Sequence, residues 1–208
     1  FSEIITSKEY EAVLENGEDM LLSKWFSGAK LNFAENLLRF RDERPALIFQ
    51  SEIVGRNSIS LSYSELYQRV AQTSKSLCDL NVRVGERVAS FMPNMPETII
   101  AMLATTSVGA AWSSASPDSG MTSMLDRFRQ IQPSILFVSD GYSFKGKIFD
   151  IVSLLPEISK ELPSLKKIII VPYIKNGKDI TCPDNSVLYG DFISAEKNLS
   201  INFEQLPF

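Results

Sequence analysis

The sequence predicts an α/β fold in which a mostly parallel, doubly wound sheet is flanked by helices. Short apolar runs rich in β-branched residues, such as 135–138 and 167–171, alternate with amphipathic stretches of helical spacing. The stretch 98–117 contains no charged residue, although charged residues make up 22% of the 208-residue chain. Strands that are buried on both faces, and the helices that pack on them, have this composition. The sequence contains neither an internal repeat nor a low-complexity segment.

The uncharged stretch predicts two buried elements in series. A membrane-spanning helix needs about 20 predominantly apolar residues, but Thr105-Thr106-Ser107, Gly109 and Ser113-Ser114 interrupt the run. We therefore expect a helix from about Pro96 to Val108, with Pro96 in its first turn, and then a strand over Ala110–Ser114.

Residues 1 to about 24 predict a short amphipathic lead-in, in which a helical pattern stops at Asn16-Gly17. The apolar residues with helical spacing are Tyr10, Val13 and Leu14. Residues 25–38 contain aromatic residues, a glycine and two asparagines, and we interpret them as a packed extended segment that leads into a helix. A surface strap clamped by Trp25 and Phe26 is the alternative.

Residues 46–50 and 59–61 predict two strands joined by a turn at Val54-Gly55-Arg56-Asn57. Ser62 and Glu65 form a capping box, in which a hydroxyl and a carboxylate satisfy the first free N–H groups of a helix. The apolar stripe of that helix is Leu66, Val70, Thr73 and Leu77.

The remaining strands are predicted at 87–92, 135–138 and 167–171, with at most a short one at 187–189. Two further helices are predicted at 121–130 and 147–155. The tail, 173–207, is polar and rich in turn residues.

The composition excludes several classes of site. With a net charge of −4, there is no global basic field of the kind that binds nucleic acid or an anionic membrane. The chain has no histidine, so Ser-His and Cys-His nucleophile pairs and histidine-ligated zinc are excluded.

The two cysteines, Cys78 and Cys182, are far apart and indicate no disulfide framework, which fits a reducing cytosol. We expect Cys78 on the apolar face of its helix, as an inert core residue. The start of the chain is acidic and lacks the apolar run of a secretory signal, so a cytoplasmic location is predicted.

Ligands of open α/β sheets bind beyond the carboxyl ends of the strands, so three post-strand loops, 93–96, 116–120 and 140–147, are the candidate sites. None contains GxGxxG or GxxxxGK[ST]. The loop Ser116, Pro117, Asp118, Ser119 and Gly120 precedes a helix, whose free N–H groups could hold a phosphate. A simple N-cap by Asp118 or Ser119 is the alternative.

Lys145-Gly146-Lys147 places two cations near a predicted helix start, either as a phosphate site or as a solvated pair. Asp126, Arg127 and Arg129 are interpreted as a solvated helix face. No paired carboxylates suggest a catalytic or metal site, and we assign no catalytic and no metal-binding residue.

Four stretches, in this order, are similar to acyl-CoA synthetases of the adenylate-forming superfamily. They are WFSGAKLNFAENLL, LSYSELYQRVAQ, VGERVASFMPNMPETIIAMLATTSVGAAWSSASPDSG and LDRFRQIQPSILFVSDGYSFKGK. The box Leu61–Leu66 is general to the superfamily, and the segment from Trp25 to Asn32 is shared with acetyl-CoA synthetases. Residues 111–118, AWSSASPD, are typical of the acetoacetyl branch. The resemblance is strong from Trp25 to about Tyr142.

The resemblance implies the reaction ATP + acetoacetate + CoA → AMP + diphosphate + acetoacetyl-CoA, with Mg as a further cofactor of the full-length enzyme. It implies that residues 1–40 are a lead-in of the acetyl-CoA synthetase type. Residues 41–208 would be the first α/β subdomain of the large amino-terminal domain. Small molecules, and neither nucleic acid nor a membrane, are the expected partners.

The family's Ser/Thr/Gly-rich phosphate loop with its lysine is absent from this sequence, and in the family it follows a segment like 203–208. We therefore expect an amino-terminal fragment that stops before the phosphate loop and works with the remainder of its own chain. By itself it should be inactive and bind no cofactor tightly.

By family position, the loop Ser116–Gly120 corresponds to a segment near the CoA pyrophosphate. Lys147, with Lys145 beside it, falls near arginines that face the CoA nucleotide phosphate. Lysine in place of arginine loses the bidentate fork and keeps a point charge. Three alternatives stay open: a ligase for another short-chain acid, a stand-alone CoA- or nucleotide-binding module, and an interaction protein without a ligand.

Overall fold

The centre of the protein is a five-stranded sheet in the order β12-β11-β8-β6-β7, in which all neighbours are parallel. The computed structural model describes residues 4–51, 53 and 58–208, and the turn predicted at 54–57 lies outside the described residues. The strands are β6 (Arg87–Phe91), β7 (Ala111–Ala115), β8 (Ile135–Ser139), β11 (Lys167–Val171) and β12 (Ser186–Leu188).

The chain starts this sheet in the middle. It enters at β6, adds β7 on one side, and returns past β6 to add β8, β11 and β12 on the other side. The predicted doubly wound parallel sheet is therefore confirmed, and β7 begins one residue later than predicted.

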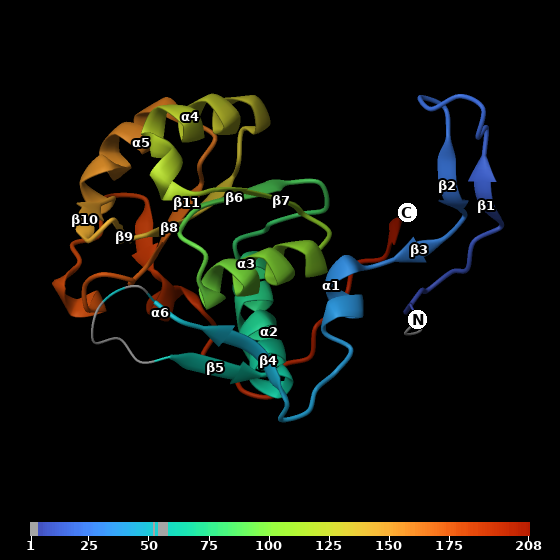
Figure 1. The fold of residues 1–208 in the computed structure, drawn as a ribbon, viewed down its shortest axis with the longest axis horizontal. Helices are drawn as coiled ribbons and strands as arrows, with labels where there is room; N and C mark the ends of the chain where they lie inside the picture. Colours follow the sequence, from blue (N-terminus) through green and yellow to red (C-terminus); the bar gives the residue numbers. More distant parts are fainter. Residues whose placement is uncertain (1–3, 52, 54–57) are drawn as a thin grey trace.

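Helices cover both faces of the sheet (Figure 1). On one face, α2 and α3 pack over Ile135 and Phe137 of β8, and on the other, α4 and α5 pack over Leu136 and Val138. Alternate residues of one strand thus enter two cores, which is why the strands are apolar throughout. The helices are α2 (Tyr63–Asp79), α3 (Pro96–Ser107), α4 (Gly120–Ile131) and α5 (Leu155–Glu161).

The helix starts follow local chemistry. The Ser62 hydroxyl accepts a hydrogen bond from the Glu65 N–H at 3.1 Å, and the Glu65 carboxylate accepts one from the Ser62 N–H at 2.8 Å. This is the predicted capping box. Pro96 occupies the first turn of α3, and Gly109, with φ +76°, follows its end.

Cys78, expected in the core, lies at the surface instead. The buried face of α2 includes the predicted stripe that ends at Leu77. Cys78 is the next residue along the helix and points away from that face. Partial burial and the neighbouring Asp79 carboxylate raise the pKa of the thiol, so it is not poised as a thiolate.

The lead-in is a hairpin, and the helix predicted from Tyr10, Val13 and Leu14 is wrong. Strand β1 (Ala12–Glu15) pairs antiparallel with β2 (Lys24–Ser27), placing Leu14 opposite Trp25. The ring of Tyr10 packs edge-on against Phe26 with 5.6 Å between centroids, and these cross-strand contacts hold the segment extended. The hairpin projects away from the sheet (Figure 1).

The predicted extended segment leading into a helix is confirmed by β3 (Lys30–Leu31) and α1 (Phe33–Leu37). The two early strands, β4 (Pro45–Phe49) and β5 (Ile59–Ser62), form an antiparallel ribbon outside the main sheet.

The tail returns across α2 and α3. Tyr189, at the start of α6 (Tyr189–Phe192), shares a hydrogen bond with Thr73 at 3.0 Å, and burial raises the pKa of Tyr189 to about 12. Farther on, β13 (Leu206–Pro207) pairs with β3. The Asn32 side chain donates to the carbonyl oxygens of Thr106, Ser107 and Glu204, at 3.0, 3.2 and 2.7 Å. The lead-in and the tail are therefore fastened together.

At the amino ends of the central strands, Glu86 accepts hydrogen bonds from the Ser134 hydroxyl at 2.6 Å and from the Lys166 ammonium at 3.1 Å. Partial burial opposes ionisation, but these two donors lower the pKa of Glu86 below its ordinary value. Among the described residues, no helix combines the length and apolar character that crossing a bilayer requires.

Candidate functional site

The carboxyl edge of the parallel sheet carries the candidate site. In open α/β sheets, ligands bind beyond this edge, at the point where the strand order reverses. Here the reversal lies between β6 and β8, because the chain leaves β6 toward one side and continues from β8 toward the other. The segments after β6, β7 and β8 are therefore neighbours along one edge.

The segment after β6, predicted as a candidate loop, is packed rather than open. Met92 and Met95 are 3% and 5% exposed and belong to the core under α2 and α3. The Thr98 hydroxyl donates to the Pro93 carbonyl oxygen at 2.9 Å, which closes the turn before α3. Of this segment, only Asn94 is exposed, and the apolar side chains face the core.

The loop after β7 leads directly into α4. Residues Pro117–Ser119 form a 3-10 turn, η1, and both the N–H and the hydroxyl of Ser119 donate to the Ser116 carbonyl oxygen, at 3.1 and 2.7 Å. Ser119 occupies the N-cap position of α4, as the alternative interpretation expected, but in the described structure its side chain makes no capping hydrogen bond to the helix. The Ser119 hydroxyl is committed to the loop instead.

The Gly120 N–H at the start of the 12-residue helix α4 donates to the Pro117 carbonyl oxygen, and among the described residues no side chain accepts from the N–H groups that follow. Ser116, Asp118 and Ser119 are exposed while Pro117 is buried. Gly120 has a φ of +81°, and apart from its chain neighbours no described residue has an atom within 4 Å of the position that a Cβ would take. An uncapped and accessible helix start attracts anions, and phosphate in particular.

The second predicted site is a β-hairpin, so the helix predicted over 147–155 is wrong. Strand β9 (Gly141–Phe144) pairs antiparallel with β10 (Lys147–Asp150). Lys145 and Gly146 make the turn, with φ of +51° and +74°, as in a type I′ hairpin. The rings of Tyr142 and Phe149 stack across the strands with 4.8 Å between centroids. A short 3-10 turn, η2 (Val152–Leu154), and then α5 follow the hairpin.

The hairpin carries both predicted lysines at its exposed end. The Lys145 ammonium lies 5.1 Å from the centroid of the Phe144 ring. Within the described parts of the chain, neither Lys145 nor Lys147 pairs with a carboxylate. Two point charges are thus presented to solvent beyond the carboxyl end of β8, where open α/β sheets generally bind ligands. The loop at 116–120 and the hairpin share the carboxyl edge of the sheet, but β6 separates the strands from which they emerge.

Sequence reasoning missed the role of Asp140, which it treated only as the first residue of a loop. Its side chain is 1% exposed, and its carboxylate accepts hydrogen bonds from the N–H groups of Tyr173, Ile174 and Lys175, at 2.6, 2.9 and 2.7 Å. An ionisable residue directly after a buried strand was the available signal, because a charge is rarely buried without partners.

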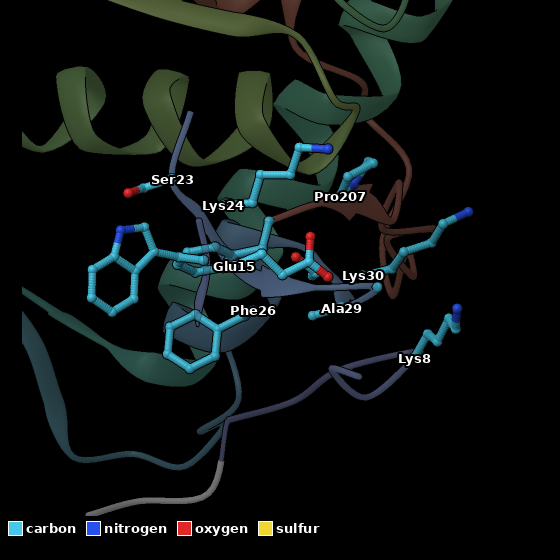
Figure 2. A pocket seen from close by; sticks show the side chains of 12 residues that line it. Lys8, Glu15, Ser23, Lys24, Phe26, Ala29, Lys30 and Pro207 are labelled. Atoms are coloured by element: carbon cyan, nitrogen blue, oxygen red, sulfur yellow. The ribbon is translucent and has the colours of Figure 1, made fainter. Parts of the chain in front are cut away.

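A hollow of about 630 Å³ lies elsewhere, between the β1–β2 hairpin and the last residues of the chain. Lys8, Lys24 and Lys30 line it, and Figure 2 shows them spread around its rim rather than converging on one point. None of the predicted site residues lines it. Among the described residues, no group of three or more histidine, cysteine or acidic side chains is arranged to hold a metal ion.

Comparison with known proteins gives a consistent result. The profile of the AMP-binding enzyme family matches residues 33–190. The acetoacetyl-CoA synthetase of Macaca fascicularis is 35% identical over 214 residues, covering 100% of this chain and 32% of the relative. The acetoacetyl-coenzyme A synthetase of Rhizobium meliloti (strain 1021) is 42% identical, covering 95% of this chain and 30% of the relative.

Among solved structures, the acetoacetyl-CoA synthetase from Streptomyces lividans superposes with a TM-score of 0.87 at 36% sequence identity. The match covers 98% of this chain and 31% of that chain. The chain therefore spans about a third of the length of these relatives.

Proposed function

Because the chain belongs to the family of AMP-binding enzymes, we propose that it is the amino-terminal part of an acid–thiol ligase that joins acetoacetate to CoA. An oxygen of the acetoacetate carboxylate attacks the α-phosphorus of ATP and releases diphosphate, which leaves acetoacetyl-adenylate. The CoA thiolate then attacks the acyl carbon and releases AMP. Mg²⁺ accompanies the nucleotide in this proposal. The observation that carries it is the similarity of the whole chain to proteins named acetoacetyl-CoA synthetase, at 34% to 37% identity.

Within this ligase, the present chain has no part in forming the adenylate. Its sequence contains no Gly-rich loop with a lysine, and we assign no catalytic residue to it. The ATP chemistry then belongs to the two thirds of the relatives' length that the chain does not span. This division predicts that the 208-residue chain by itself releases no diphosphate from ATP.

The part that we assign to this chain is to receive CoA. The uncapped start of α4, at Ser116–Gly120, would face the pyrophosphate, and Lys145 and Lys147 would face the nucleotide phosphate. Asp118 is the only charged residue in that loop, and its carboxylate opposes an anion there. The lysines at the hairpin end therefore supply the net positive charge.

A fusion of these 208 residues to the remaining two thirds of the R. meliloti relative tests the proposal. We expect diphosphate release with acetoacetate and ATP, and acyl transfer when CoA is added. The double variant Lys145→Gln/Lys147→Gln should raise the KM for CoA about tenfold and leave adenylate formation unchanged. Lys160→Gln, an exposed lysine on α5, is the matched control.

Activity of the fusion with another short acid, and not with acetoacetate, would refute the substrate assignment. Titration calorimetry on the 208-residue chain provides a test that does not depend on the fusion. Tight binding of ATP by this chain would contradict the division of tasks and favour a stand-alone nucleotide-binding module.

A cytoplasmic location belongs to the same proposal. Cys78 and Cys182 are both free and exposed, which suits a reducing compartment. Fractionation of cells that express the protein should recover it with cytosolic markers, and recovery with a secreted fraction would contradict this assignment.

A further inference from the structure

The carboxylate of Asp140 occupies an anion site that the protein builds from its own backbone. Three successive N–H groups, those of residues 173–175, converge on its two oxygens at 2.6 to 2.9 Å. Successive N–H groups of this kind form a concave site that elsewhere holds phosphates. Here the site lies beyond the end of β11 and is filled from β8, so an external anion cannot use it.

The same residue holds the base of the hairpin through its backbone. The Asp140 N–H donates to the Val171 carbonyl oxygen at 3.1 Å, and the Asp140 carbonyl oxygen accepts from the Ile151 N–H at 2.9 Å. Asp140 precedes β9, and Ile151 follows β10, so both ends of the hairpin meet at this residue. Beside it, a Cβ added to Gly141 would lie 2.5 Å from the Phe149 carbonyl oxygen. The base of the hairpin is therefore so tightly packed that residue 141 has no room for a side chain.

A second tie runs along the outside of the hairpin. The Lys175 ammonium lies 2.8 Å from the Asp150 carboxylate, which also accepts the Ser153 N–H at 2.8 Å. Lys175 reaches Asp150 from the backbone segment that Asp140 fixes. By fixing the backbone of Lys175, the Asp140 carboxylate therefore positions the ion pair between Lys175 and Asp150. Both interactions hold the hairpin that carries Lys145 and Lys147.

We propose that Asp140 is a positioning residue for CoA: by anchoring residues 173–175, it sets the position of the hairpin end and of its two lysines. The inference rests on the proposed role of Lys145 and Lys147 in meeting CoA phosphates. Asp140 itself is 1% exposed, so we assign it no direct contact with CoA. Its loss would let the hairpin tilt on the sheet, and the lysines would no longer be held where the phosphate binds.

The test compares Asp140→Asn with Asp184→Asn, an exposed aspartate without a side-chain partner among the described residues. Asparagine keeps the shape but turns an N–H group toward the donors of 173–175. Hydrogen exchange of the amides in 141–150 should accelerate at least about tenfold in Asp140→Asn, while the amides of α2 keep their protection. Asp184→Asn should leave both regions unchanged.

The functional readout separates positioning from general damage. In the fusion enzyme, Asp140→Asn should raise the KM for CoA about tenfold and leave the KM for ATP and the rate of adenylate formation unchanged. With pantetheine as the thiol, which lacks the nucleotide phosphates, the variant and the unmodified fusion should react alike. Lys175→Gln cuts only the exposed outer tie and should give a smaller change in the same direction, even if Asp140→Asn fails to fold.

Unchanged exchange in 141–150, in both Asp140→Asn and Lys175→Gln, would overturn the inference whether or not the chain meets CoA. Faster exchange with an unchanged KM for CoA would overturn it for a different reason. The hairpin would then be mobile without consequence, and the proposed contact between its lysines and CoA would fall with it.

Discussion

Replacing Asn32 by alanine and by aspartate separates two tasks that one buried amide performs. Its Oδ1 accepts a hydrogen bond from the Glu35 N–H at 3.2 Å and so caps α1. Its Nδ2 lies 2.7 Å from the carbonyl oxygen of Glu204 and 3.0 Å from that of Thr106. The residue is 2% exposed, so these hydrogen bonds are shielded from bulk water in the folded chain.

Alanine should lower the free energy of unfolding by about 2–4 kcal/mol. The lost N-cap contributes about 1 kcal/mol, and the carbonyl group of Glu204, left without a donor, contributes about 1–3 kcal/mol. Aspartate keeps the cap but directs a carboxylate oxygen at carbonyl oxygens inside the protein. An uncompensated buried charge costs about 3–5 kcal/mol, so aspartate should destabilise more than alanine.

Urea unfolding at pH 7, followed by tryptophan fluorescence and circular dichroism, measures both values. Asn94→Asp, at an exposed position, controls for the added charge and should change the free energy of unfolding by less than about 0.5 kcal/mol. An aspartate variant at residue 32 that is as stable as the original chain would refute the reasoning. The N-cap would then be the only function of this side chain.

Three further predictions concern pH and backbone strain. Because the pKa of Glu86 is lowered in the folded protein, the ionised carboxylate contributes fully to the free energy of unfolding above pH 4.5. This contribution is lost as the pH falls through the pKa that Glu86 has in the folded protein. Glu86→Gln should therefore cost about 0.5–1 kcal/mol at pH 7 and flatten the acid limb of urea unfolding. Burial raises the pKa of Tyr189 from 10.0 to about 12 in the folded protein. The neutral phenol therefore stabilises the fold below pH 10, and this stabilisation is lost as the pH rises from 10 to about 12. Over this interval the original chain should lose about 2–3 kcal/mol more than Tyr189→Phe. Gly109→Ala combines a φ of +76° with a Cβ 2.8 Å from Glu204, whereas Gly85→Ala has the same φ and open space. Both should lower the melting temperature, Gly109→Ala by the larger amount.

Each of these has a result that would contradict it. An acid limb that is unchanged by Glu86→Gln would mean that its donors contribute nothing to stability. Equal alkaline unfolding of Tyr189→Phe and the original chain would exclude the buried phenol as a cause. Equal melting temperatures for the two alanine variants would show that Glu204 moves aside without cost.

Sequence patterns correctly predicted those elements that are determined by residues close together in the chain. The capping box at Ser62 and the proline at the start of α3 give their helices the predicted starting points. The hairpin β9–β10 was not predicted because Ile148, Ile151 and Leu155 have helical spacing. Ile148 is 64% exposed, while Ile151 and Leu155 are buried after the strand has ended, so one periodicity joined two unrelated elements.

The candidate site was likewise predictable only where its causes are local in the sequence. Loops that follow buried strands are predictable, because parallel strands end at one edge. The anchoring of the hairpin is not, because Asp140 and its partners at 173–175 are 33 to 35 positions apart and no period connects them. The same holds for the side chain of Asn32.

The pairing of β3 with β13 also sets an order of events during synthesis. Asn32 and Glu204 are 172 positions apart, and closing so long an unfolded loop would cost about 4–5 kcal/mol. We therefore expect the central sheet to form first and bring the two segments together. At about 5–20 residues per second, the ribosome needs roughly 10–35 s to deliver the second partner. During that time the early segment, with its aromatic side chains, is available to chaperones or to a neighbouring nascent chain.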